Sequence, residues 1–414
     1  MIRDFSVENF RSIKTKQSIS FEPNKKVNYG IEDYVLMDAS KNDKLLKFIV
    51  LYGYNASGKS TVLDAIDFIR SIQLHFHVSK REQTGFVPFL FDEGIKKSPG
   101  KFTLNFYIDK ILYHYYISLD NNIIYKEELS FKPEGRKAII FERHYDEHKK
   151  ISSLIFSPRC NFSMSGKLIL TGNTTNNNTV LSSYDRSNVN SEEFDKVYKY
   201  FNENLVAGIK PATNIIKRSL KHMEEDKESQ NFYSTLLKKA DFQIDDVDLL
   251  DGTNTKKREE IKKIVFEHSN DYGKFTFSSS MESNGTMRFF GLESIMYQLV
   301  NRGIFMSIDE FDTSLHSALV SEFIKIYLAN STKSQLIITT NDISLMDKEY
   351  MRRDMMYLCE KQKDGSSTYR NVQQFKLHKR ILIEKRYREG SLGAIPHYGS
   401  TSLSQLNEGG DLID

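Results

Sequence analysis

The feature that most constrains this chain is the segment GYNASGKST at residues 53–61. It satisfies the pattern GxxxxGK[ST] and lies between an apolar segment, 45–53, that predicts a buried strand and a segment, 61–76, that has helical spacing. Backbone N–H groups of such a turn can surround phosphate oxygens, and the helix N-terminus adds partial positive charge. A chance glycine-rich turn has a prior of about 1%. We therefore predict an α/β nucleotide-binding core, held by Gly53, Asn55, Ser57, Gly58, Lys59, Ser60 and Thr61.

An apolar strand that ends in two acids supplies the second half of the expected site. Residues 304–308 are apolar apart from Ser307, and Asp309 and Glu310 follow directly. We expect Asp309 and Ser60 to hold Mg²⁺, Lys59 to reach the β and γ oxygens of ATP, and Glu310 to accept the proton of the attacking water. Taken alone, an apolar strand that ends in Asp-Glu has about even odds of being only structural. Together with the phosphate loop it predicts Mg²⁺-dependent ATP hydrolysis.

A third motif, Glu282-Ser283-Asn284-Gly285-Thr286, precedes a segment of helical periodicity. Ser283 can cap that helix, and the backbone N–H groups after it can receive an anion. By itself the motif favours a simple helix cap about two to one. Its place just before the acidic strand changes that weighting toward a phosphate contact.

Patterning along the chain divides it into five parts. Residues 1–86 carry the first part of the core, and 87–172 alternate like a β-rich lobe. Residues 173–270 predict an Asn/Ser/Thr-rich loop, over 171–188, followed by a helical insertion. Residues 271–398 complete the core with a β-α-β alternation, and 399–414 form a polar tail.

Composition excludes several classes of protein. The 58 basic and 55 acidic residues give a net charge of +3, so a nucleic-acid contact would need a local patch. Cys160 and Cys359 are too few for a disulfide framework or a zinc cluster, which favours a cytoplasmic protein. No apolar run reaches the 18 to 20 residues that a membrane span needs.

These motifs, in this order, resemble the ATP-binding-cassette-type AAA ATPases of the RecF/SMC/OLD group. Within it they are most similar to compact bacterial abortive-infection and anti-phage ATPases of the RloA, AbiL, AriA and PtuA kind. The resemblance runs nearly end to end and also includes FSVENFRSI, VPFLFD, LLKKADFQIDDV, SIDEFDTSLH, QLIITTND, MRRDMMY and YREGSLGAIP. It implies a P-loop NTPase with an antiparallel β lobe and an inserted helical lobe.

The resemblance also implies a head-to-tail homodimer, or an oligomer of dimers, in which Ser283, Asn284 and Gly285 contact ATP bound to the other subunit. It places Asn9 and Arg11 near the nucleotide and the loop Asp312–His316 at the dimer interface. His316 has about even odds of being only an interface or core residue.

The sequence departs from the resemblance at two positions. Asn341 stands where many relatives have a histidine that senses the γ-phosphate, which predicts slow or trigger-dependent hydrolysis. Gln83 lies in the region of the glutamine that many relatives use between their lobes, but it lacks a strand context and stays unassigned.

Related defence ATPases are encoded with a separate effector, often a TOPRIM-like, RloB-like or HNH nuclease, and we expect such a partner here. About 70 residues follow Ile343, and they contain no cluster of acids suited to nuclease metals. Two alternatives remain. One is a DNA-binding repair-type ATPase, which would use the basic residues Lys376, His378, Lys379, Arg380, Lys385, Arg386 and Arg388, although a solvated helix face is about twice as probable. The other is a nucleotide-gated scaffold with little turnover.

Overall fold

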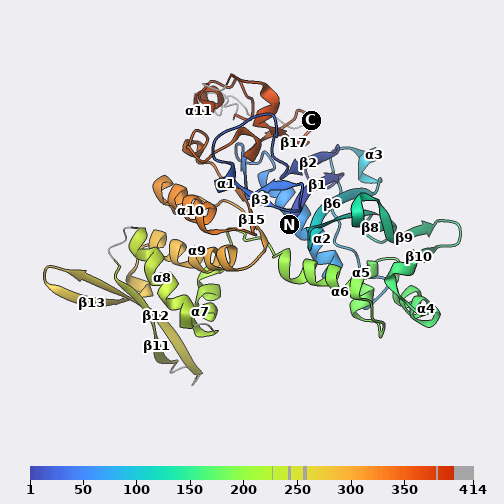
Figure 1. The fold of residues 1–414 in the computed structure, drawn as a ribbon, viewed down its shortest axis with the longest axis horizontal. Helices are drawn as coiled ribbons and strands as arrows, with labels where there is room; N and C mark the ends of the chain where they lie inside the picture. The colour runs from blue at the N-terminus through green and yellow to red at the C-terminus, as the bar shows by residue number, and fades with distance from the viewer. Residues whose placement is uncertain (226, 241–243, 255–258, 379–380, 396–414) are drawn as a thin grey trace, which may run out of the picture.

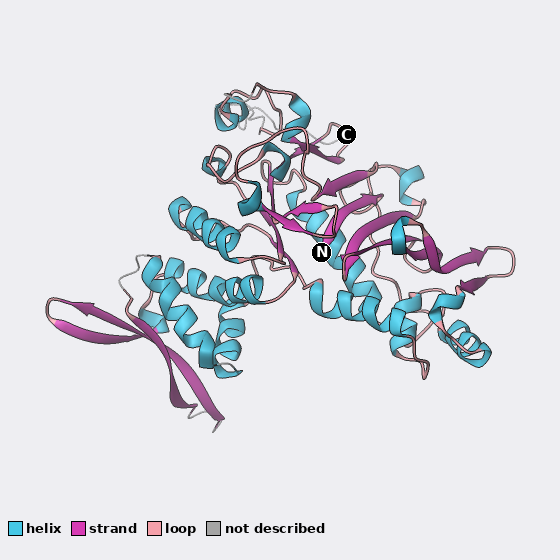
Figure 2. Cartoon of the chain, in the orientation of Figure 1, coloured by secondary structure: helices cyan, strands magenta, loops and turns pink. Residues whose placement is uncertain are grey.

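The computed structural model describes residues 1–414 except 226, 241–243, 255–258, 379–380 and 396–414. The expected polar tail, the basic residues Lys379 and Arg380, and Pro396 of the last motif therefore lie outside the described residues. The described strands form two larger sheets and two small ones (Figure 2). The α/β fold class expected from the phosphate loop is confirmed.

A five-stranded sheet forms the core, in the order β14-β15-β5-β16-β17. Its strands are β5 (Phe48–Tyr52), β14 (Phe305–Ile308), β15 (Gln335–Thr339), β16 (Met356–Lys361) and β17 (Ser367–Asn371). All pairs are parallel except β16 with β17. Every residue of β5, β14 and β15 is buried, as expected for parallel strands covered on both faces.

A seven-stranded antiparallel sheet lies beside the core, in the order β10-β9-β8-β7-β6-β1-β2. The first two strands of the chain belong to it. Its bounds are β1 (Ile2–Glu8), β2 (Gln17–Ser20), β6 (Gly100–Ile108), β7 (Ile111–Leu119), β8 (Ile124–Phe131), β9 (Ala138–Asp146) and β10 (Ile151–Phe156). The remaining small strands β3 (Leu36–Asp38) and β4 (Lys44–Leu46) pair with each other.

Helix α2 (Lys59–Leu74) connects the two sheets (Figure 1). It starts at the phosphate loop, which follows β5. Its Phe68 packs against Phe10 and against Phe102 of β6, with ring centroids 5.5 Å and 5.2 Å apart, respectively. The helical periodicity after residue 60 correctly predicted this element.

The other described helices are short, apart from four in the second half of the chain. They are α1 (Glu32–Val35), α3 (Glu93–Lys96), α4 (Met164–Asn173), α5 (Val180–Asp185), α6 (Glu192–Lys199), α7 (Ile215–Glu225), α8 (Lys227–Lys239), α9 (Asn284–Asn301), α10 (Ser317–Asn330) and α11 (Ile383–Arg388). Helix α6 continues into one π-helical turn, Tyr200–Asn204. None of the described helices is long and apolar enough to cross a bilayer.

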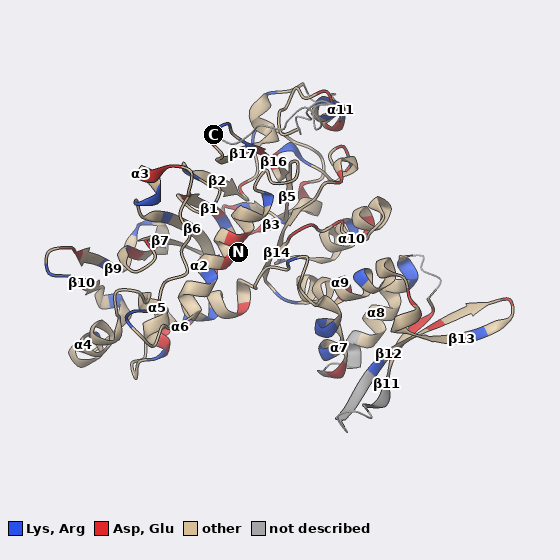
Figure 3. Ribbon diagram, turned by 180° about the vertical axis from the view of Figure 1, so that it is seen from behind, with Lys and Arg blue, Asp and Glu red and all other residues tan. Residues whose placement is uncertain are grey.

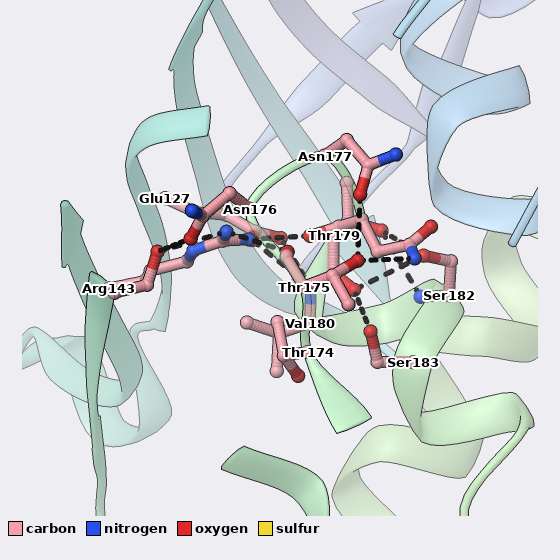
Figure 4. Close-up of polar contacts among 12 residues, drawn as sticks. Glu127, Arg143, Thr174, Thr175, Asn176, Asn177, Thr179, Val180, Ser182 and Ser183 are labelled. Carbon is pink, nitrogen blue, oxygen red and sulfur yellow. Dashed lines mark hydrogen bonds and ion pairs between the residues drawn. The ribbon is translucent and has the colours of Figure 1, made fainter. Parts of the chain in front are cut away.

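The structure shortens the predicted loop, 171–188, because 171–173 end α4 and 180–185 form α5, and only 174–179 between them are without helix or strand. Residues 174–183, which we call the polar strap, comprise this loop and the first four residues of α5. They are mostly buried, and the charged pair Glu127 and Arg143 lies against them (Figure 4). The Arg143 guanidinium donates to the carbonyls of Asn178 and Thr175, and Glu127 accepts from the backbone N–H of Val180. Asn, Ser and Thr indicate a loop when they face water. Here the backbone of residues 72–82 accepts from these side chains instead: Asn177 donates to the carbonyl of Ser79, Asn178 to that of His77 and Thr179 to that of Ile72.

The insertion contains a β-structure that the helical pattern did not predict. Strands β11 (Asp246–Asn254), β12 (Glu259–Asn270) and β13 (Gly273–Ser278) form a three-stranded antiparallel sheet that projects beyond α7 and α8 (Figure 1). Helix α9 packs against both α7 and α8. The helical lobe and its projecting sheet therefore rest on the helix that follows Ser283.

Candidate functional site

At Gly53 and Gly58 of the phosphate loop, the surrounding atoms leave no room for a side chain. Gly58 has φ +103°, and a Cβ there would come within 2.8 Å of the Ser367 Cβ and 2.9 Å of the Ser12 Oγ. A Cβ at Gly53 would lie 2.5 Å from the carbonyl oxygen of Cys359. Both positions therefore need glycine, for conformation at Gly58 and for close approach of β16 at Gly53.

Side-chain hydroxyl groups form hydrogen bonds that fix this loop. Ser12 Oγ lies 2.8 Å from Thr61 Oγ1 and accepts a 2.9 Å hydrogen bond from Ser367 Oγ, while the Tyr369 hydroxyl donates to the carbonyl of Gly58 at 2.6 Å. The Thr61 hydroxyl, which was expected to contact the nucleotide, therefore forms a hydrogen bond within the protein. Sequence reasoning missed Ser12, Ser367 and Tyr369, although Ser12 stands within the FSVENFRSI motif.

Lys59 and Asn341 meet at the mouth of the loop. The Lys59 ammonium donates to the carbonyls of Gly53 at 2.6 Å and Tyr54 at 3.3 Å, and to Asn341 Oδ1 at 3.0 Å. Burial lowers the pKa of Lys59, and the nearby carboxylates of Asp309 and Glu310 oppose that shift. The structure therefore brings together two residues that lie far apart in the sequence, at the ends of β5 and β15.

Thr339, at the end of β15, organises the two acids after β14. Its hydroxyl donates to Asp309 Oδ1 at 2.5 Å and accepts from the backbone N–H of Glu310 at 2.7 Å. Thr339 is fully buried, Asp309 is half-buried, and Glu310 is exposed with φ +47°. Thr339 was not predicted. The sequence feature that could have identified it is a hydroxyl residue at the end of an apolar strand that lies beside the acidic strand.

The parallel order β14-β15-β5 places the acids and the phosphate loop at one edge of the sheet. Ser60, in the first turn of α2, and Asn55 are exposed, whereas the Ser57 side chain is fully buried. An ammonium, exposed hydroxyl and amide groups, and a half-buried carboxylate at one edge suit a phosphate chain with its divalent cation.

Asn9 and Arg11, which were expected near the nucleotide, make contacts with other parts of the chain. Asn9 is buried, and its amide donates to the carbonyls of Ile95 and Ser98 and accepts from the N–H of Phe89. It shapes the neighbouring loop. Arg11 is exposed and forms an ion pair with Asp64, one turn into α2.

Ser283 caps α9, as predicted. Its hydroxyl accepts from the backbone N–H of Thr286 at 3.0 Å, and Asn284 is exposed at the start of the helix. A Cβ on Gly285 would lie 3.1 Å from the carbonyl oxygen of Ser314, so the motif packs beside the loop that follows the acids. The motif and the 312–316 loop therefore form one surface, on which the His316 side chain caps α10.

Comparison with known proteins shows the family to which the chain belongs. Residues 48–347 match the family described as "AAA domain, putative AbiEii toxin, Type IV TA system". This chain belongs to that AAA-domain family. The match spans β5 to the turn after β15, and so includes the phosphate loop, the capped helix and the acidic strand. None of the curated proteins is similar enough to match.

Among solved structures, this AAA-domain protein is similar to three SMC head domains. One is bound to the C-terminal winged-helix domain of ScpA (14% identity, TM-score 0.47, 90% of this chain and 99% of that chain). The second is from Thermotoga maritima (12%, 0.43, 89% and 98%). The third is a Pyrococcus furiosus head with an extended coiled coil, bound to the C-terminal domain of ScpA (14%, 0.41, 94% and 98%).

The AAA-domain protein also has a pocket of about 820 Å³ beside the phosphate loop. The loop after β15 and the C-terminal helix α11 form its other walls. It is lined by Tyr52, Gly53, Tyr54, Asn55, Thr340, Asn341, Ile343, Tyr387, Arg388 and Ile395. A ligand at Lys59 would thus lie close to the segment 387–395. This segment belongs to the motif YREGSLGAIP, but no residue of it was predicted to line the site.

Proposed function

We propose that this chain is a Mg²⁺-dependent ATPase in which Lys59 and the phosphate loop bind ATP, Asp309 and Ser60 hold the ion, and Glu310 activates water. The observation that carries the proposal is the convergence of Lys59, Asn341 and Thr339 with the two acids at one sheet edge. The pieces are preorganised, because backbone and hydroxyl groups fix each of them.

In this proposal ATP joins two copies of the chain head to tail. The surface made by Ser283, Asn284 and Gly285 would cover the nucleotide of the partner, since these residues cap their own helix and expose its N-terminus. Membership of the family favours a role in toxin-antitoxin or phage-defence systems. We therefore propose that the dimer is a switch that holds or releases a separately encoded effector, a nuclease of TOPRIM-like, RloB-like or HNH type.

Direct action on DNA has weaker support. At α11 basic and acidic residues lie side by side (Figure 3), with Arg388 paired to Glu384 and Arg386 paired to Glu389. Paired charges neutralise fewer phosphates than a continuous basic face would. The other alternative is a scaffold with little turnover, and its support is Asn341 in place of the expected histidine. Asn341 nevertheless accepts a hydrogen bond from Lys59, so it is part of the site.

The test is ATP turnover by the wild type and by Glu310→Gln, each alone, with duplex DNA, and with the product of the adjacent gene. A general base contributes about 10²- to 10⁴-fold, so Glu310→Gln should lose at least about 100-fold in turnover while it keeps ATP and accumulates as a dimer. Lys59→Ala should lose ATP binding.

Glu349→Gln is the matched control, because Glu349 is an exposed acid on the surface after β15. It should behave as the wild type does. Normal turnover by Glu310→Gln would refute the assignment of the base, and ATP binding with no turnover under any condition would favour the scaffold. Stimulation by one addition identifies the class of partner.

A further inference from the structure

The loop after α2 brings together three side chains that are typical metal ligands. His75 is the C-terminal cap of α2, His77 follows two residues later, and Glu82 returns toward them. Their ligand atoms all lie within 4.8 Å of one another, and the two imidazole rings stand edge to face with centroids 4.9 Å apart. This is the one such cluster among the residues that the structure describes.

The polar strap fixes the backbone of this loop. The side-chain amide of Asn178 accepts from the N–H of His77 at 2.7 Å and donates to its carbonyl at 2.9 Å. Asn177, shown in Figure 4, donates to the carbonyls of Ser79 and Glu82. Both asparagines are fully buried. The loop is therefore held by the same network that surrounds Glu127 and Arg143, and its position does not depend on a ligand.

The carboxylate of Glu82 is oriented as well. One oxygen accepts from the backbone N–H of Ser79 at 2.7 Å, and the other lies 3.4 Å from His77 Nδ1. His75 and Glu82 are exposed while His77 is buried, so solvent reaches the cluster from one side.

We propose that His75, His77 and Glu82 form a binding site for one divalent transition-metal ion of the zinc class. Bonds of about 2.0–2.2 Å to such an ion place two ligand atoms at most about 4.4 Å apart, which small rotations of the exposed His75 and Glu82 achieve. Imidazole ligands select Zn²⁺ or Co²⁺ over Mg²⁺, which prefers oxygen. Water completes the coordination.

The bound ion would connect the end of α2 to the loop 75–82 and, through Asn177 and Asn178, to the polar strap. Helix α2 begins at the phosphate loop, but the site lies at its opposite end. The carbonyl groups at a helix C-terminus carry partial negative charge and favour a cation there. The site therefore contributes to the stability of the structure and is separate from the chemistry at Lys59.

The experiment is titration of tag-free, metal-free full-length protein with Zn²⁺ alone and with Co²⁺ alone, without nucleotide. We expect one ion per chain by calorimetry, a Co²⁺ spectrum of four-coordinate type, and a rise in melting temperature on adding Zn²⁺. His75→Gln and Glu82→Gln should each weaken Zn²⁺ binding at least tenfold and abolish that rise. Both substitutions are at exposed positions and should leave the metal-free protein folded.

His148→Gln is the matched control, since His148 is exposed in the turn between β9 and β10. It should bind Zn²⁺ as the wild type does. The proposal is overturned if the wild type binds no Zn²⁺ at micromolar concentration, which would leave His77 and Glu82 as an ion pair only. It is also overturned if His75→Gln and Glu82→Gln bind as tightly as the wild type.

Discussion

The phosphate loop (53–61) and the polar strap (174–183) are both rich in small polar residues and both lead into a helix, yet they use their polar groups in opposite ways. In the phosphate loop Asn55 and Ser60 remain exposed. In the strap, Thr179 and Asn178 are fully buried and bonded to other parts of the chain. The difference teaches that residue type alone does not decide exposure. The presence of hydrogen-bond partners inside the protein, here the carbonyls of Ile72 and His77, does.

The largest expected effect is at the strap. Burial already raises the pKa of Glu127 to about 7, and Arg143 opposes that shift. Arg143→Met therefore forces the Glu127 carboxyl to take up a proton or to remain an unpaired buried charge, and it removes the donor to Asn178, so the free energy of unfolding should fall by about 3–5 kcal/mol. Denaturant unfolding measures it. Arg136→Met, at an exposed arginine, should change stability by less than about 0.5 kcal/mol. A loss below about 1 kcal/mol for Arg143→Met would mean that the strap does not depend on its internal ion pair.

A glycine substitution tests the other region. Gly58→Ala adds a Cβ at φ +103° against Ser367 and Ser12, so the loop must shift at a cost of about 1–3 kcal/mol, and ATP affinity should fall up to about 100-fold. Binding of a fluorescent ATP analogue measures it. Gly172→Ala is the control, because no heavy atom lies within 4 Å of the Cβ position there. Unchanged affinity in Gly58→Ala would show that the loop tolerates the shift.

Thr339→Val removes the hydroxyl that holds Asp309 and Glu310. A hydrogen bond to a charged group contributes about 1.5–3 kcal/mol, so turnover should fall about tenfold or more, with ATP affinity nearly unchanged. Steady-state kinetics separates the two quantities. Thr339→Ser keeps the hydroxyl and should restore most of the activity. If the serine variant is as slow as the valine variant, the threonine acts through packing.

The smallest effect is expected at Asn341. Asn341→Ala removes one of three hydrogen bonds of the Lys59 ammonium. Because Asn341 is exposed, water can replace its amide, so we expect a loss of only about 0.5–1.5 kcal/mol and a threefold to tenfold fall in turnover. Asn122→Ala, at an exposed amide in the turn between β7 and β8, is the control and should keep the turnover of the wild type. A larger loss at Asn341 than at Thr339 would mean that the contact with Lys59, and not the positioning of the two acids, controls hydrolysis.

The sequence predicted the parts of the site whose chemistry fixes both residue type and spacing. Gly58, Lys59 and the acids after β14 are of this kind, because phosphate and metal contacts permit few alternatives. Thr339 was not predicted, although the β-α-β alternation predicts that β14 and β15 belong to one parallel sheet. Its role depends on its hydroxyl pointing at Asp309 and at the N–H of Glu310, which is a tertiary contact that local pattern does not contain.

The same reason explains the errors in the fold. The Asn and Thr residues of 174–183 predict a solvated loop unless the carbonyls of Ile72, His77 and Ser79, about 100 residues earlier, are known to accept from their side chains. The sheet formed by β11, β12 and β13 carries many charged and small residues, so its alternation was weaker than the helical periodicity of α7 and α8 beside it. Long, strongly periodic elements such as α2 and α9 were predicted correctly.

The order of strands in the core sets the timing of its assembly during synthesis. Strand β5 pairs with β15 and β16, both of which leave the ribosome about 250 residues or more after it, some 10–60 s later at about 5–20 residues per second. The antiparallel sheet is complete at Phe156 and can form first. An early, incomplete chain therefore has the phosphate loop but no partners for its strand, so nucleotide could bind productively only to a nearly finished protein.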